Sequence, residues 1–132
     1  MIPLPIDRCN TAGARILLGL ALLIITAMTL TPSPGMLQQS VNDKLGHALA
    51  FLLLAFLIHA SWPKYRFGWR QIIPLFAYAV AIEIFQYFIP NRYFSLLDVL
   101  ADMVGIGIYL LLLWCYCWLQ KSAGCKSIGA TK

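Results

Sequence analysis

The chain has 132 residues, of which 61% are hydrophobic and only 11% are charged, and its formal net charge is +5. A soluble domain is usually about 45–50% apolar and about 25% charged, and a soluble protein of this size could not bury so much apolar surface. The composition therefore excludes an ordinary soluble domain and favours a single compact unit that lies in a membrane.

Four apolar segments follow one another along the chain and predict four transmembrane helices. They span residues 14–30, 45–61, 71–89 and 96–119. Each is close to the roughly 20 residues that a helix needs to cross the hydrocarbon core. Helices are the default in lipid because their backbone satisfies its own hydrogen bonds. We therefore predict an all-α polytopic membrane protein, a bundle of four transmembrane helices in residues 1–120, followed by a polar cytoplasmic tail at 121–132.

The basic residues are distributed unevenly between the two ends of the predicted helices. Eight of the ten Lys and Arg residues lie near the N-terminus, in the second connection or in the tail, whereas Lys44 and Arg92 lie near the other two connections. The positive-inside rule therefore predicts that both termini and the second connection lie in the cytoplasm. The same bias explains the net charge, so we predict no nucleic-acid partner. Basic residues before a short apolar run are also typical of a secretory signal, and cleavage there would leave three helices.

The acidic residues gather at the opposite, outer ends of the predicted helices. Of the five acids only Asp7 lies elsewhere; the outer four are Asp43, Glu83, Asp98 and Asp102. Other polar residues accompany them, namely Lys44, His47, Gln86 and Arg92. This convergence is partly independent of the topology, because the topology was derived from Lys and Arg alone.

The spacing of these residues predicts that they share helix faces. Asp43 and His47 are four residues apart, as are Asp98 and Asp102, so each pair lies on one face of its helix. At a rise of about 1.5 Å per residue, Glu83 and Asp102 lie roughly 10 Å below the outer boundary. Carboxylates at that depth are costly unless they are paired, protonated or hydrated, so they should face the bundle interior or a wet cleft.

Each polar residue also has a purely structural interpretation. Asp43 and Asp98 could cap helix N-termini, where the helix dipole favours negative charge. Lys44 could reach lipid headgroups, and Arg92 could hold a phosphate or a salt-bridge partner. His47 could be a packed and hydrogen-bonded histidine.

Three other residues are assigned structural roles. His59, at the cytoplasmic end of the second segment, is predicted to face the membrane interface. Gly105 and Gly107, in the fourth segment, are predicted to allow close helix packing, as small residues do in membranes.

The outer polar residues fall into three motifs. They are DKLGH at 43–47, EIFQ at 83–86 and RYFSLLDVLAD at 92–102. The chain thereby resembles the VanZ-like family of small integral membrane proteins, which shows D-K-x-x-H, E-x-x-Q and R-x-x-S-x-x-D-x-x-x-N segments before a glycine-containing helix. The resemblance covers residues 40–115 and departs from the family pattern at Asp102, where the family commonly has asparagine.

The resemblance implies a role at the cell envelope, since the family takes its name from a protein associated with resistance to the glycopeptide teicoplanin. We expect the outer cluster to bind or act on a lipid-linked or glycopeptide-related envelope ligand. The candidate ligand-binding residues are Asp43, Lys44, Gln86, Arg92 and Asp98. In an alternative, the chain is a membrane enzyme that acts on a lipid phosphate, with Glu83, His47 and Asp102 as acid–base residues.

Two further alternatives stay open. The cluster could be a polar lock that fixes helix packing in a non-enzymatic module, or the chain could be an accessory to proton- or ion-coupled transport. The expected partners are membrane lipids and a lipid-linked envelope precursor. No cofactor is predicted, because there is no glycine-rich phosphate loop. The acids and His47 could hold a divalent metal, but no metal-binding motif supports this and no metal is predicted.

Overall fold

The described part of the protein is a bundle of four α-helices. The computed structural model describes the backbone of residues 8–30, 41–89 and 94–128, and the side chains of residues 11–30, 43–89 and 94–120. The helices are α1 (Arg8–Leu30), α2 (Val41–Ser61), α3 (Trp69–Tyr87) and α4 (Leu96–Ile128). No strand occurs within these ranges. The prediction of an all-α bundle is confirmed.

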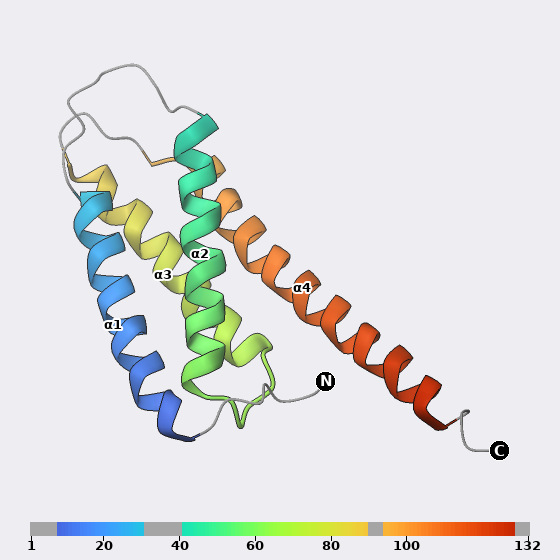
Figure 1. Cartoon of the computed structure of the whole chain (residues 1–132). Coiled ribbons are helices and arrows are strands. Elements are labelled where there is room, and N and C mark those ends of the chain that lie inside the picture. The colour runs from blue at the N-terminus through green and yellow to red at the C-terminus, as the bar shows by residue number, and fades with distance from the viewer. Residues whose placement is uncertain (1–7, 31–40, 90–93, 129–132) are drawn as a thin grey trace.

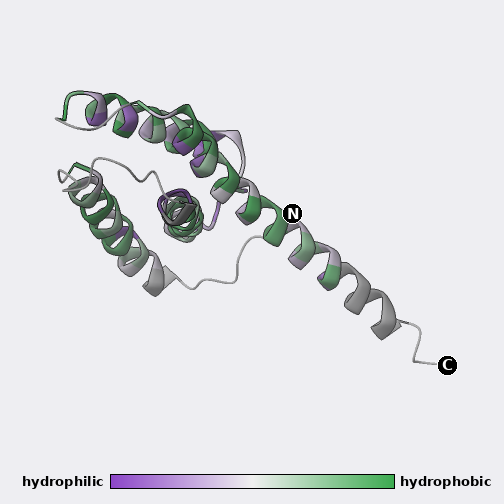
Figure 2. Cartoon of the chain, turned by 90° about the horizontal axis from the view of Figure 1, so that it is seen from above, coloured by the Kyte–Doolittle hydropathy of each residue, from purple (hydrophilic) through white to green (hydrophobic). Residues whose placement is uncertain are grey.

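Consecutive helices run in opposite directions (Figure 1). One end of the bundle, here called the polar end, is therefore formed by the last turns of α1 and α3 and the first turns of α2 and α4. Seen from above, α2 lies end-on in the middle, with α1 on one side and α3 and the start of α4 on the other (Figure 2). The central helix contacts all three others, and most extensively α4.

Three of the helices are long and apolar enough to cross a membrane, over Thr11–Leu30, Asp43–Ser61 and Leu96–Gln120. The third helix, α3, is not among them, although it runs antiparallel to α2 within the same bundle (Figure 1). Its polar residues Gln71, Glu83 and Gln86 are buried inside the bundle. Large apolar side chains cover the outside of the helices instead, as in a protein whose solvent is lipid. The chain is therefore a membrane protein.

The fourth helix is longer than the sequence indicates. Its apolar segment was predicted to end at Leu119, but α4 continues to Ile128 and so takes up much of the segment predicted as a polar tail. Its second half projects away from the other helices (Figure 1). A helix already formed can propagate through residues that are not apolar, because each added residue gains one backbone hydrogen bond.

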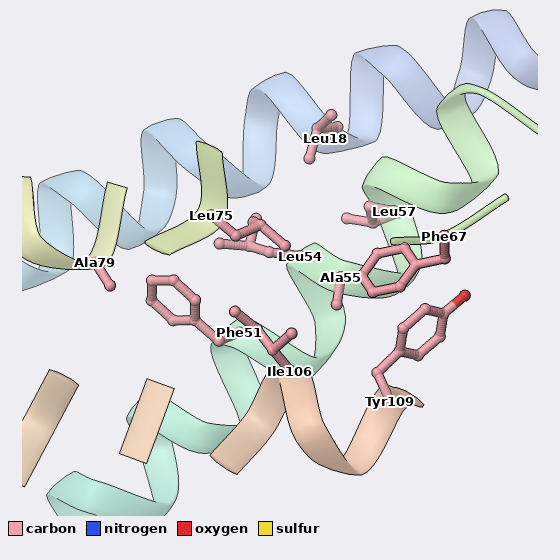
Figure 3. Packing of buried hydrophobic residues seen from close by; sticks show 10 residues of the cluster. All are labelled: Leu18, Phe51, Leu54, Ala55, Leu57, Phe67, Leu75, Ala79, Ile106 and Tyr109. Carbon is pink, nitrogen blue, oxygen red and sulfur yellow. The ribbon is translucent and has the colours of Figure 1, made fainter. Parts of the chain in front are cut away.

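A continuous apolar core joins all four helices and the α2–α3 connection (Figure 3). Its buried members are Leu18, Phe51, Leu54, Ala55, Leu57, Phe67, Leu75, Ala79, Ile106 and Tyr109. In lipid, burial of apolar surface gives little driving force, so the bundle depends on close packing and on hydrogen bonds between helices.

Helix α4 packs closely against α2 at Gly105. A Cβ atom at this position would clash with the carbonyl oxygen of Ala48 and lie 3.0 Å from the backbone nitrogen of Leu52. At Gly107 a Cβ atom would meet nothing within 4 Å. The predicted packing role is therefore correct for Gly105 and wrong for Gly107, which lies on the open side of the same helix.

His59 was predicted to face the membrane interface, and this prediction is wrong. Its side chain is buried, and its Nδ1 lies 2.7 Å from the hydroxyl oxygen of Tyr109 on α4. The ring of Phe67 packs edge-on against Tyr109, with ring centroids 5.0 Å apart. The long α4 covers the last turn of α2, so the histidine finds a buried partner that its position in the sequence does not indicate.

We expect Tyr109→Phe to destabilise the bundle by about 1–3 kcal/mol, because it leaves the buried Nδ1 of His59 without its partner. The matched control is Tyr116→Phe, which removes an exposed hydroxyl that lies 2.7 Å from Gln120. The free energy of unfolding in mixed micelles would be measured for both. Equal values for the two variants would contradict a structural role for the His59–Tyr109 contact.

Basic and aromatic residues line the end of the bundle opposite the polar end. Arg15 on α1 donates from Nε to the carbonyl oxygen of Ser61 at 3.3 Å, and its guanidinium lies 5.4 Å from the centre of the Trp62 ring. Arg70 lies similarly over Trp69, at 5.6 Å. Apart from Lys44, the described basic side chains thus lie at the end of the bundle opposite the acidic ones.

Candidate functional site

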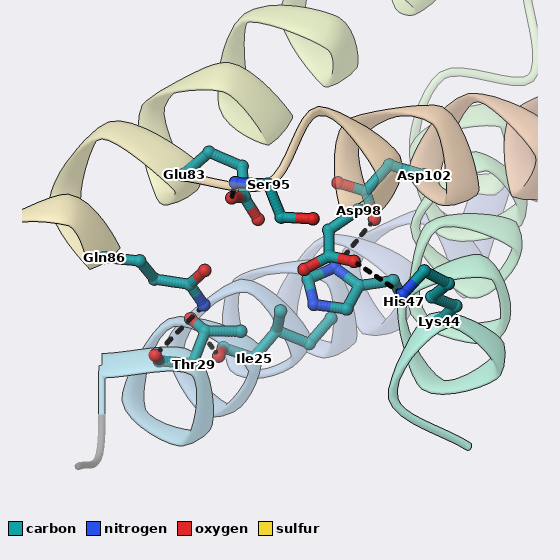
Figure 4. A network of polar contacts seen from close by, with 9 residues as sticks. All are labelled: Ile25, Thr29, Lys44, His47, Glu83, Gln86, Ser95, Asp98 and Asp102. Atoms are coloured by element: carbon teal, nitrogen blue, oxygen red, sulfur yellow. Dashed lines mark hydrogen bonds and ion pairs between the residues drawn. The ribbon is translucent and has the colours of Figure 1, made fainter. Parts of the chain in front are cut away.

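A cluster of polar side chains from α2, α3 and α4 meets at the polar end of the bundle (Figure 4). The polar cluster consists of the labelled residues Lys44, His47, Glu83, Gln86, Ser95, Asp98 and Asp102, together with Asp43, which lies close to His47 and Asp98. All of these except Ser95 were named from the sequence. The remaining candidate, Arg92, lies outside the described residues.

Helix geometry explains why these residues converge. Asp43 and Asp98 lie in the first turns of α2 and α4, where the helix dipole stabilises a carboxylate. Ser95 directly precedes α4, and its carbonyl oxygen accepts from the backbone N–H of Asp98 at 3.0 Å. Ser95 therefore occupies the N-cap position of α4, and Asp98 lies inside the first turn.

His47 and Asp102 join α2 to α4. The Nδ1 atom of His47 lies 3.0 Å from Oδ1 of Asp102. Asp102 is fully buried, and the side chain of His47 is only 10% exposed. When Nδ1 carries the proton and donates it to the carboxylate, Nε2 presents a free lone pair. Asparagine, the common family residue at this position, could accept the same hydrogen bond but would bring no charge.

Glu83 joins α3 to the start of α4. Its Oε2 accepts a hydrogen bond of 2.9 Å from the backbone N–H of Ser95. The side chain is fully buried, in agreement with the prediction that it faces the bundle interior. Glu83 thus fixes the position at which α4 begins.

Several carboxylate oxygens in the cluster lack a donor. Lys44 Nζ lies 3.9 Å from Oδ1 of Asp98, which is too long for a hydrogen bond. Among the described residues, Glu83 Oε1, Asp98 Oδ1 and Asp102 Oδ2 are buried and have no hydrogen-bond partner. Buried polar atoms in native proteins are almost always satisfied, so each of these oxygens calls for a proton, a water molecule, an ion or a ligand group.

Sequence reasoning missed the residues of α1 that complete this end of the bundle. Gln86 Nε2 donates to the carbonyl oxygen of Thr29 at 3.2 Å (Figure 4). The hydroxyl oxygens of Thr26 and Tyr78 lie 2.8 Å apart, and Tyr78 also donates to the carbonyl oxygen of Leu22 at 3.1 Å. The only signal in the sequence was the presence of two threonines near the end of an apolar segment.

The fold and the site define a small polytopic helical membrane protein with a buried polar cluster at one end of its bundle. A sequence model of the VanZ/LLP1 family matches residues 18–120, which include the whole cluster. The chain therefore belongs to the VanZ/LLP1 family, and the resemblance carried by the three motifs is confirmed. Searches of curated proteins and of solved structures found no match.

Proposed function

We propose that the polar cluster binds the headgroup of a cell-envelope ligand, a lipid or a lipid-linked precursor, and that this binding supports tolerance of teicoplanin-type glycopeptides. Family membership supports the link to glycopeptides. The cluster lies at the end of the bundle, and this is the level at which a lipid headgroup would lie. Asp43 is exposed and the side chain of Lys44 is 30% exposed, so these two residues form the accessible edge.

The observation that carries this proposal is the set of buried carboxylate oxygens without a donor. A polar lock evolved only for packing would pair its acids, because an unsatisfied buried group costs about 1–3 kcal/mol. A headgroup rich in hydroxyl, amide or amine groups would supply donors. Lys44, at the rim, suits an acidic group of the same ligand, such as a phosphate.

The site residues have different proposed roles. Asp43, Lys44 and His47 would contact the ligand, since they reach the surface of the cluster. Glu83 and Asp102 are fully buried and would hold the other side chains in position. Gln86 and Asp98 are also buried, but together with Arg92 they keep the ligand-binding roles expected from the sequence.

The proposal includes an orientation of the bundle in the membrane. The basic residues Arg15, Lys64, Arg66 and Arg70 lie in the first part of α1, in the α2–α3 connection and in the first turn of α3, at the end opposite the cluster. Under the positive-inside rule that end faces the cytoplasm, and the polar cluster faces the outer side of a bacterial inner membrane. Both termini would then be cytoplasmic.

A second candidate function, acid–base catalysis on a lipid phosphate, is favoured by the contact between His47 and Asp102. A carboxylate that holds Nδ1 of a histidine leaves Nε2 to transfer a proton, as in many hydrolases. Release of phosphate from a lipid phosphate by the purified protein, lost in His47→Gln, is the expected result for this candidate. A turnover that is equal in wild type and variant would exclude it.

The proposed binding function is tested by glycopeptide susceptibility in a Gram-positive host. We expect the wild-type chain to raise the inhibitory concentration of teicoplanin above that of the empty vector, and Lys44→Gln to lose most of the increase, because Lys44 lies at the accessible edge of the cluster. Lys64→Gln is the matched control, since the same change is made at an exposed lysine on the opposite end. Membrane levels would be compared by blot.

Two results would contradict the proposal. One is a wild-type chain that leaves teicoplanin susceptibility unchanged. The other is an equal loss of tolerance in Lys44→Gln and Lys64→Gln at equal abundance, which would trace the effect to total charge rather than to the polar cluster.

A further inference from the structure

We infer that Asp43, His47 and Asp98 form a binding site for a divalent cation, of which Mn²⁺ and Zn²⁺ are the examples best suited to these ligands. One ligand atom from each residue lies within 4.8 Å of the other two. An ion at about 2.0–2.2 Å from each atom requires them to be closer than this limit, which small rotations of the side chains would achieve. Two of the three residues come from the first two turns of α2, and the third comes from the first turn of α4.

The buried oxygen of Asp98 is the observation that points from this cluster to a ligand. The side chain of Asp98 is only 5% exposed, and its Oδ1 has no hydrogen-bond partner among the described residues. Lys44, at 3.9 Å, offsets part of the charge but makes no hydrogen bond. A carboxylate this deeply buried is expected to be paired or to coordinate a metal.

The environment of His47 is that of a metal ligand. Its Nδ1 is engaged by Asp102 at 3.0 Å, which leaves Nε2 as the coordinating atom. Histidines that bind metals usually donate their other N–H group to a carboxylate, which fixes the tautomer and the ring orientation. Asp102 is fully buried and would serve in this supporting position.

The donor set determines the class of cation. Carboxylate oxygens suit Mn²⁺, and imidazole suits Zn²⁺, so two carboxylates with one imidazole fit either ion. Three protein ligands leave at least one position open for water or for an oxygen of a bound ligand. Coordination of a headgroup phosphate at that position rests on the proposed envelope function, whereas the cation site itself does not.

The test is Mn²⁺ binding by the full-length chain in phosphatidylcholine nanodiscs, purified with a tag that contains no histidine. Binding is read from the loss of the paramagnetic resonance signal of free Mn²⁺. This ion is chosen because it prefers oxygen and imidazole ligands to thiolates, so that the four cysteines of the chain do not compete. We expect saturable binding of one ion per chain, weakened about tenfold or more in Asp43→Asn, Asp98→Asn and His47→Gln.

Two variants sharpen the result. His59→Gln is the matched control for His47→Gln and should bind as wild type does, because His59 lies at the other end of α2. Lys44→Gln should tighten Mn²⁺ binding, since it removes a positive charge 3.9 Å from Asp98. Asp43 is exposed, so Asp43→Asn separates loss of a ligand from loss of folding, which circular dichroism would check.

Absence of saturable binding to wild type, or equal affinity in wild type and the three ligand variants, would overturn the cation site. The result of the teicoplanin susceptibility assay does not depend on whether the chain binds Mn²⁺. Saturable Mn²⁺ binding by a chain that confers no tolerance would uphold the site and reject the envelope role. If the wild-type chain binds no Mn²⁺ but confers tolerance that Lys44→Gln loses, the envelope role is upheld and the cation site is rejected.

Discussion

Replacing Gly105 with alanine is expected to destabilise the bundle by about 1–3 kcal/mol, the usual cost of forcing extra atoms into a packed interior. The added Cβ would clash with the carbonyl oxygen of Ala48, and it would lie 3.0 Å from both the carbonyl carbon of Ala48 and the backbone nitrogen of Leu52. These are backbone atoms of α2, so no side-chain rotation can relieve the contact, and the two helices must separate. A leucine at the same position should prevent stable packing altogether.

Gly107→Ala is the control, because it makes the same change two residues along α4 where a Cβ would meet nothing within 4 Å. Alanine has the higher helix propensity, so this variant should be neutral or more stable by at most about 1 kcal/mol. The measurement is the free energy of unfolding by dodecyl sulfate in mixed micelles. Equal stabilities for the two alanine variants would show that α2 and α4 do not cross at Gly105.

Replacing His47 with leucine is expected to cost about 3–5 kcal/mol, because it leaves the fully buried carboxylate of Asp102 without its partner. The double variant His47→Leu with Asp102→Leu should recover most of this loss, since a buried polar pair can often be exchanged for apolar residues at little cost. Asp102→Asn should cost less than Asp102→Leu, because the amide oxygen can still accept the hydrogen bond from Nδ1. The free energies of unfolding of the wild type, of His47→Leu, of Asp102→Leu and of the double leucine variant would give the coupling energy of the pair.

Additive effects of the two leucine substitutions would contradict a direct contact between His47 and Asp102. The same double variant separates a packing role from a binding role. If it folds well and still confers teicoplanin tolerance, the pair serves only to fix α2 against α4. If it folds well and loses tolerance and Mn²⁺ binding, the cluster acts on a ligand.

The fold class and most of the polar cluster could be predicted from the sequence because both depend on local patterns. Apolar segments of membrane length require helices, since lipid offers the backbone no other hydrogen-bond partners. Buried acids in such segments must face inward, and the i,i+4 spacing of Asp98 and Asp102 places them on one helix face. These constraints operate within a single helix, so no knowledge of its neighbours is needed.

The contacts between helices could not be predicted from the sequence, because they depend on how the helices pack against one another. Nothing in the sequence indicates that Gly105 lies against α2 while Gly107 does not, because the two glycines differ only in the direction they face. The partner of His59 is Tyr109, fifty residues away, and the donor to Glu83 is the backbone N–H of Ser95. The packing of α3 and α4 against α2 determines these pairings and the convergence of Asp43, His47 and Asp98. Sequence spacing within one helix does not specify the distances between side chains of different helices.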